Sequence, residues 1–312
     1  MRLPEFARRP ILAALIAAFT SLAAIPAFAE TPAEVSTDKR PNMWVVKDAD
    51  STVYLFGSVH LLKAESQWLT PELEAVFDSA DTLYLEIADM DDQAQAAALV
   101  MKYGTDPTWG LYEPYTPEQV AQIRDSLTRH GINPDQVKPL KPWLVALMLS
   151  IKQLEASGFD PNIGVDKTFM ARAKAKGLPV KGLESMEDQF LSFANAPPEA
   201  QSEYLWMTVS EEAYSQDIIA ELVEAWLIGD DAALEGLLVQ EMKEKTPAIY
   251  DSLMVKRNRN WIGAIKTILE GSGTQFIVVG AGHLSGPDSV QNMLKADGIE
   301  VAGYDYSQPP KP

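Results

Sequence analysis

Two histidines occupy matching positions near opposite ends of the chain. Each ends a Gly-x-x-His string that follows a β-type run, Thr52–Phe56 before His60 and Gln275–Val279 before His283. The chain contains only three histidines, so this pattern accounts for two of them. Glycine permits a sharp turn at a strand end, and open α/β sheets bind ligands at the carboxyl ends of their strands. We therefore predict that both imidazoles face one site.

A carboxylate completes a candidate ligand set. Glu86 closes the apolar run Asp81–Ile87, which is typical of a strand. Two imidazoles and one carboxylate commonly hold a divalent metal that keeps an open position. Glu86 could instead act as a general base or orient an imidazole. Ring nitrogens that share one ion lie roughly 4 Å apart, so a separation well over about 8 Å would exclude a shared site.

Arg257 and Asn258 are the next candidates for chemistry. They lie on a predicted helix, Tyr250–Glu270, that precedes the second histidine strand. Both could anchor a substrate carboxylate or carbonyl, or clamp Glu86. The alternative is an exposed polar helix face with Trp261 in the core.

Asp166 and Glu184 follow turn or strand signals. Each could hydrogen-bond to a metal ligand or a catalytic group and orient it, or simply cap a helix. The third histidine, His130, follows a predicted helix and precedes Gly131. We interpret it as a cation at a helix C-terminus, which is electrostatically favourable. The chain has no cysteine, so thiolate metal sites and thiol proteases are excluded.

The predicted strands cluster near the two ends of the chain, with one near the middle. They are Met43–Val46, Thr52–Phe56, Asp81–Ile87, Leu178–Leu183, Gln275–Val279 and Glu300–Gly303. Capping signals at Thr70 and Thr116 and long apolar periodicities indicate helices in between. We expect an α/β fold with a mixed central sheet, formed by the N- and C-terminal parts, and a large helical insertion at about 91–245.

The first 29 residues have the pattern of a secretory signal peptide. An arginine-containing start and an apolar stretch precede small residues, which predicts cleavage after Ala29. An uncleaved anchor is the alternative. Residues 30–41 read as a flexible leader, 42–306 as the α/β domain and 307–312 as a tail. We therefore expect a periplasmic protein with no membrane span after cleavage.

The formal charge of the chain is −18. Such a surface repels phosphate backbones, so we expect no nucleic-acid partner. A peptide or a small molecule is the expected substrate class, and the oligomeric state stays open.

The order and spacing of these motifs resemble the TraB/GumN family, which is related to the Tiki metalloproteases. The resemblance runs from Trp44 to about Tyr304. It rests on both Gly-x-x-His strings, Glu86, a Gly-Val-Asp and a Leu-Glu-Ser segment, and an Arg-Asn-x-x-Trp helix. It implies a mixed sheet with helices in two pseudo-related halves. It also implies a peptidase that depends on manganese or cobalt, with His60, Glu86 and His283 as metal ligands.

The implied fold is also similar to that of erythromycin-esterase-like and ChaN-like proteins. Three hypotheses therefore stand together. The first is a divalent-metal-dependent hydrolase, foremost a peptidase, in which Arg257 or Asn258 binds the oxyanion. The second is a metal-independent, esterase-like hydrolase in which Glu86 activates His60 as the base. The third is a non-catalytic protein that binds haem or another ligand between the two histidines.

Overall fold

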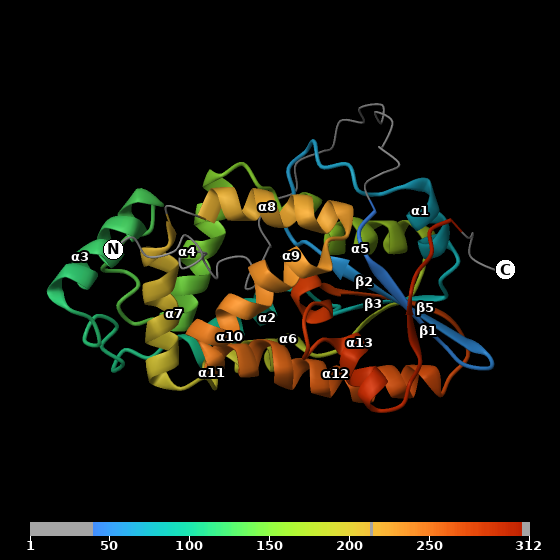
Figure 1. Ribbon diagram of the computed structural model, residues 1–312. Coiled ribbons are helices and arrows are strands. Elements are labelled where there is room, and N and C mark those ends of the chain that lie inside the picture. The colour runs from blue at the N-terminus through green and yellow to red at the C-terminus, as the bar shows by residue number, and fades with distance from the viewer. Residues whose placement is uncertain (1–39, 213–214, 308–312) are drawn as a thin grey trace, which may run out of the picture.

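Figure 1 shows the computed structural model, which describes residues 40–212 and 215–307. The predicted signal peptide 1–29 lies outside the described residues, as do nearly all of the leader and of the tail. Within the described ranges, no helix combines the length and apolar character that crossing a membrane requires.

A six-stranded mixed sheet forms the centre of the α/β part, in the order β4-β3-β5-β2-β1-β6. Strands β4, β3, β5 and β2 are parallel to one another, whereas β1 is antiparallel to both β2 and β6. The strand bounds are Met43–Lys47 (β1), Ser51–Ser58 (β2), Thr82–Leu85 (β3), Val180–Gly182 (β4), Gly273–Gly280 (β5) and Val301–Gly303 (β6). All six predicted strands are present, and the expected α/β class is confirmed.

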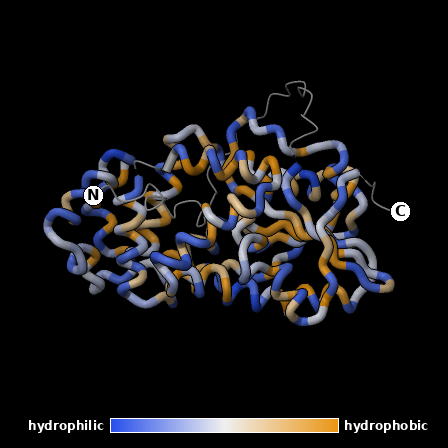
Figure 2. Tube along the Cα trace, in the orientation of Figure 1, coloured by the Kyte–Doolittle hydropathy of each residue, from blue (hydrophilic) through white to orange (hydrophobic). Residues whose placement is uncertain are grey.

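The two central strands are buried along almost their whole length. Continuous apolar runs of this kind are typical of parallel strands that are covered on both faces. Phe56 and Phe276 belong to the larger core, in which aromatic rings pack against one another. Leu55 and Ile277 face a smaller core that contains Trp261. Figure 2 shows the resulting concentration of hydrophobic residues at the sheet.

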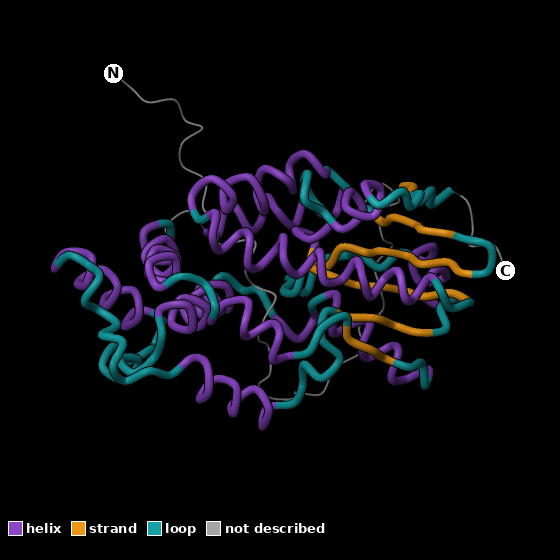
Figure 3. The backbone as a smooth tube through the Cα atoms, turned by 90° about the horizontal axis from the view of Figure 1, so that it is seen from below, coloured by secondary structure: helices purple, strands orange, loops and turns teal. Residues whose placement is uncertain are grey.

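Most helices lie between β3 and β5 in the sequence. Only α1 precedes β3 and only α13 follows β5 among the α-helices of the described residues. The helix bounds are Pro71–Asp78 (α1), Gln93–Leu99 (α2), Pro117–Arg129 (α3), Pro142–Ala156 (α4), Val165–Lys176 (α5), Met186–Ala194 (α6), Pro198–Ser210 (α7), Ser215–Ile228 (α8), Asp231–Glu235 (α9), Glu241–Lys245 (α10), Pro247–Tyr250 (α11), Lys256–Leu269 (α12) and Val290–Ala296 (α13). In Figures 1 and 3 the strands gather at one end of the molecule, and α3, α4 and α7 lie at the other. Strand β4 comes from within the helical region and joins the sheet edge.

The predicted helix Tyr250–Glu270 is not a continuous α-helix. A π-helical turn, η7 (Asp251–Val255), separates α11 from α12, and a second such turn, η6 (Gly236–Gln240), lies between α9 and α10. Each π-turn changes the direction in which the following side chains point, and such turns frequently occur at functional sites. The predicted caps agree better, because Thr70 and Thr116 accept the expected backbone hydrogen bonds.

Candidate functional site

The carboxyl ends of the four parallel strands meet at one edge of the sheet. Ser58 at the end of β2 is in register with Gly280 at the end of β5. Leu85 at the end of β3 is in register with residues of both β5 and β4. The residues that follow these strand ends include His60, Glu86, Glu184 and His283. Parallel pairing therefore brings together side chains from distant parts of the sequence.

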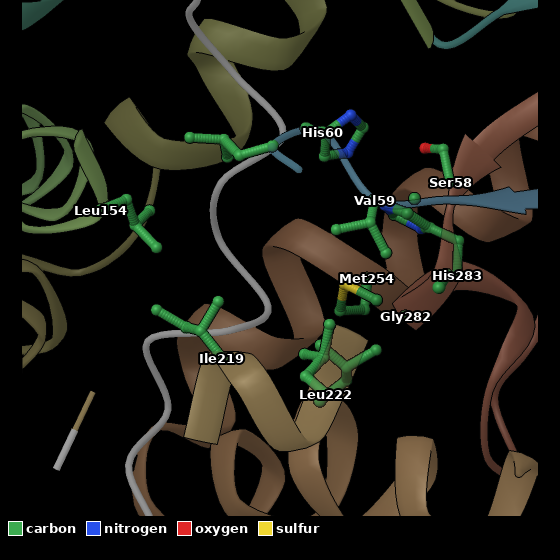
Figure 4. A pocket seen from close by; sticks show the side chains of 13 residues that line it. Ser58, Val59, His60, Leu154, Ile219, Leu222, Met254, Gly282 and His283 are labelled. Carbon is green, nitrogen blue, oxygen red and sulfur yellow. The ribbon is translucent and has the colours of Figure 1, made fainter. Parts of the chain in front are cut away.

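Gly280 marks the small space that the two imidazoles and Glu86 share. A methyl group on its Cα would lie 3.1 Å from His60 Nε2, 3.2 Å from Glu86 Oε1 and 3.6 Å from His283 Cδ2. Both rings therefore border one small space, as a shared site requires. Figure 4 shows His60 and His283 bordering the same cavity.

His60 is held by an aspartate that begins α5. Its Nδ1 lies 2.5 Å from Asp166 Oδ2, and Asp166 Oδ1 accepts a hydrogen bond of 3.1 Å from the Ser58 hydroxyl. Because a carboxylate only accepts, the hydrogen of the neutral ring is on Nδ1. The other nitrogen, Nε2, is buried and has no hydrogen-bond partner among the described residues. Asp166 is thus both a helix N-terminal acid and the support of His60.

The pKa of His60 is raised above its ordinary value. Burial acts in the opposite direction, since it disfavours the imidazolium. The charge and hydrogen bond of Asp166, together with the charge of Glu86, outweigh that cost. His60 therefore lies in an environment that favours positive charge.

Glu86 is buried and ionised. Its Oε1 accepts the Gly280 N–H at 2.7 Å, and its Oε2 accepts from Arg257 Nη2 at 2.6 Å and from Gln189 Nε2 at 3.1 Å. Burial alone would raise the pKa of Glu86, but Arg257 and the neighbouring imidazoles lower it to about 2. The sequence carried no signal for Gln189, which is an ordinary buried position on α6.

Arg257 clamps two glutamates. Nε donates to Glu184 at 2.9 Å, and Nη2 donates to Glu184 and Glu86, both at 2.6 Å. Nη1 donates to the Leu253 carbonyl at 3.2 Å and faces His283 Nε2 at 3.1 Å. All five N–H groups of the guanidinium are therefore used. This is the predicted clamping role, and it leaves no donor for an oxyanion.

His283 is neutral, and both of its ring nitrogens are engaged. Asn258 Nδ2 donates to the Asp288 carbonyl at 2.8 Å, so Asn258 Oδ1 is the atom that lies 2.6 Å from His283 Nδ1. Nδ1 therefore carries the hydrogen, and Nε2 accepts from Arg257. Burial and the charge of Arg257 lower the pKa of His283 to about 3. Asn258 consequently positions His283 rather than facing a substrate.

Trp261 closes the site on the helix side. Its ring lies 4.4 Å from the His283 ring, centre to centre, and its Nε1 donates to Glu184 at 3.1 Å. The side chain is fully buried, as the core interpretation predicted. Burial and repulsion from Glu86 raise the pKa of Glu184 despite its bonds to Arg257.

The buried charges around the site do not cancel. Three carboxylates, those of Glu86, Asp166 and Glu184, accompany the single guanidinium of Arg257. With both imidazoles neutral, these four groups carry a formal charge of −2. Opposite charge is favoured in such an environment, so the site favours a cation.

Two contacts that the sequence did not reveal hold the first Gly-x-x-His string. Trp226 on α8 donates its Nε1–H to the Gly57 carbonyl at 2.8 Å. Gly164 packs so closely that a methyl group on it would lie 2.1 Å from the His60 carbonyl oxygen. That close approach explains the glycine of the Gly-Val-Asp segment. His130, by contrast, is the C-cap of α3 and pairs with Glu212 away from the site.

Only part of the predicted three-ligand set has lone pairs available to bind a metal. His60 Nε2 has no hydrogen-bond partner among the described residues, and Glu86 Oε1 faces the shared space, but His283 Nε2 accepts from Arg257. Within the residues that the structure describes, no three histidine or acidic side chains form a ready metal cluster. Ligation by His283 stays a prediction that requires Arg257 to release Nε2.

Comparison with known proteins gives two matches. The model of the TraB/PrgY/gumN family matches residues 42–302. An uncharacterized protein of Treponema pallidum (strain Nichols) is 22% identical over 279 residues, which cover 82% of this chain and 81% of that protein. No solved structure matches significantly.

Replacement of Arg257 by alanine should strongly destabilise the protein. It would leave Glu86 and Glu184 buried without their counter-ion, which typically costs about 3–5 kcal/mol of unfolding free energy. Urea denaturation followed by circular dichroism measures the loss. Arg259→Ala, an exposed arginine on the same helix, is the matched control and should change stability by less than about 0.5 kcal/mol. Equal effects of the two substitutions would contradict the clamp.

Acid should destabilise the metal-free protein through His283. The folded protein holds its pKa near 3, below the ordinary 6.5, so the unfolded chain binds an additional proton between these values. The melting temperature should therefore fall as the pH is lowered from about 6.5 toward 3. His283→Gln should reduce this pH dependence. An unaltered slope in His283→Gln would show that His283 is not buried neutral.

Proposed function

Because the chain belongs to the TraB/PrgY/gumN family, we propose that it is a divalent-metal-dependent hydrolase that cleaves peptides at His60 and Glu86. One observation carries the proposal. His60 Nε2 is buried, has no partner among the described residues, and borders the same small space as Glu86 Oε1. A buried acceptor of this kind is costly unless a ligand or reactant completes its bonding.

The residues fit a divalent cation in three ways. A histidine ligand commonly has its other nitrogen bonded to a carboxylate, as His60 has with Asp166. The absent side chain of Gly280 keeps open the space between His60 Nε2 and Glu86 Oε1. The formal charge of −2 on the surrounding buried groups matches the charge of the ion. Imidazole and carboxylate donors suit manganese or cobalt, the metals that the family resemblance implies.

His60 and Glu86 would hold the ion, with His283 joining only on release from Arg257. A bound divalent ion supplies a water of lowered pKa and polarises the scissile carbonyl. Asp166 keeps the proton on His60 Nδ1, so the lone pair of Nε2 stays directed into the site. Arg257 keeps Glu86 ionised and oriented.

A metal-free hydrolysis is the second candidate, and the His60–Asp166 pair favours it. An imidazole whose Nδ1–H is held by a carboxylate is suited to act as a general base through Nε2. In this candidate Asp166 would be the activating carboxylate, because it is the one that contacts His60 Nδ1, whereas the esterase-like hypothesis named Glu86. A haem between the two histidines has weaker support, because both nitrogens of His283 are already bonded.

Metal analysis of the purified protein tests the main proposal. We expect about one divalent ion per chain, loss of the ion in His60→Ala and Glu86→Gln, and retention in His130→Ala. EDTA should abolish peptide cleavage, and manganese should restore it. Activity that resists EDTA but disappears in His60→Ala would select the metal-free candidate. Absence of stoichiometric metal together with cleavage that manganese leaves unchanged would reject the metal-dependent form.

Asp166→Asn should weaken metal binding about 10- to 100-fold without unfolding the protein, since outer carboxylates orient histidine ligands. Calorimetric titration of the metal-free variant with manganese measures the change. Asp160→Asn is the matched control. Asp160 accepts the backbone N–H of Asn162 as a helix N-cap, and an asparagine can keep that hydrogen bond. Equal manganese affinities in both variants would show that Asp166 does not support metal binding.

A further inference from the structure

A narrow cavity adjoins the two imidazoles (Figure 4). Its far wall consists of Leu154 from α4, Ile219 and Leu222 from α8, Leu238 from η6 and Met254 from η7. All five side chains belong to the helical region or to the π-turns, whereas the histidines come from strand ends. The helical region thus contributes directly to the site.

The chemistry of the cavity wall is almost entirely apolar. Apart from the two imidazoles and the Ser58 hydroxyl, every lining residue is an aliphatic residue, a methionine or a glycine. Arg257 bonds to both Glu86 and Glu184, and none of these three charged residues lines the cavity. A charged group placed there would lose its hydration without finding a counter-charge on the far wall.

The position of the cavity relates this wall to the reacting groups. Its lining includes His60 and Gly280, which also border the space beside Glu86 Oε1. A substrate whose scissile carbonyl lies at His60 and Glu86 therefore directs its neighbouring group against the apolar wall. Burial of an apolar group there is favourable in proportion to its area.

We propose that this cavity binds an uncharged, apolar side chain next to the scissile bond, so that the substrates are peptides with a hydrophobic residue at that position. The inference rests on the proposed hydrolase function and specifies its substrate class. Leu222 and Met254 are the specificity-determining residues. A methionine here can adapt to side chains of different shape.

A peptide series that differs only in the residues flanking the scissile bond tests the substrate class. Leucine or phenylalanine at one flanking position should raise kcat/KM at least about tenfold over alanine. Glutamate or lysine at that position should lower kcat/KM about 100-fold relative to leucine. Equal cleavage of charged and apolar peptides would overturn the inference.

Two leucines on α8 supply a matched pair of variants. Leu222 lines the cavity and Leu227 does not, yet both side chains are only 4% exposed. Leu222→Ala should enlarge the cavity and shift the ratio of kcat/KM for phenylalanine over leucine peptides about tenfold toward phenylalanine. Leu227→Ala should keep this ratio within about twofold of the unaltered protein. If Leu222→Ala does not fold, Ile219→Val provides the smaller enlargement of the same wall. An unchanged ratio in the folded cavity variant would overturn the inference.

A binding measurement separates this inference from the proposed function. N-acetyl-leucine methylamide should bind the full-length His60→Ala variant more tightly than N-acetyl-glutamate methylamide, as measured by calorimetry. Leu222→Ala should weaken the leucine probe at least about threefold, and Leu227→Ala should not. Preferential binding of the leucine probe by His60→Ala, together with no peptide hydrolysis by the unaltered protein, would reject the enzyme and retain the apolar site. Peptide hydrolysis by the unaltered protein, together with equal binding of both probes by His60→Ala, would retain the enzyme and reject the apolar site.

Discussion

The arrangement of the site depends on the buried guanidinium of Arg257. This residue is 4% exposed, and its guanidinium joins Glu86 after β3, Glu184 after β4 and His283 after β5. Burying an ion costs several kcal/mol, and the cost is recovered only when partners satisfy every hydrogen-bonding group. All five N–H groups have such partners, so the ends of three parallel strands are bound to one helix. Glu86 consequently stays ionised, and His283 stays neutral with a defined tautomer.

This constraint divides the site into a closed and an open half. Arg257 and its partners form the closed half, in which no donor remains free for a substrate. His60, held by Asp166, forms the open half, where Nε2 lacks a partner among the described residues and faces an apolar cavity. One guanidinium accompanies three carboxylates, Glu86 and Glu184 in the closed half and Asp166 in the open half, so the open half favours positive charge. A proton on His60 and a divalent ion are two ways to meet the same electrostatic demand.

The sequence was sufficient to locate the strand ends and to suggest the clamp on Glu86, but not the other side-chain partners. Alternating and continuous apolar runs indicated all six strands, and parallel pairing then brought His60, Glu86 and His283 to one edge. Asp166 lies 106 residues from His60 in the sequence. Whether the two side chains meet depends on which helix has its first turn beside the end of β2. No local pattern encodes that choice. Gln189 was missed for the same reason, and the π-turns were missed because their apolar spacing also suits an α-helix.

The two Gly-x-x-His strings are equivalent in sequence but not in chemistry. Each places a histidine just beyond a parallel strand, and the strands themselves are neighbours in register. The difference arises from what packs against each ring. Asp166 bonds to one nitrogen of His60, and the other has no partner in the described part of the chain, whereas Asn258 and Arg257 bond to both nitrogens of His283. A carboxylate beside His60 raises its pKa, and a guanidinium beside His283 lowers its pKa. Under the proposed function, the reactive histidine is therefore His60, whereas the hydrogen bonds of His283 connect it to Asn258 and Arg257.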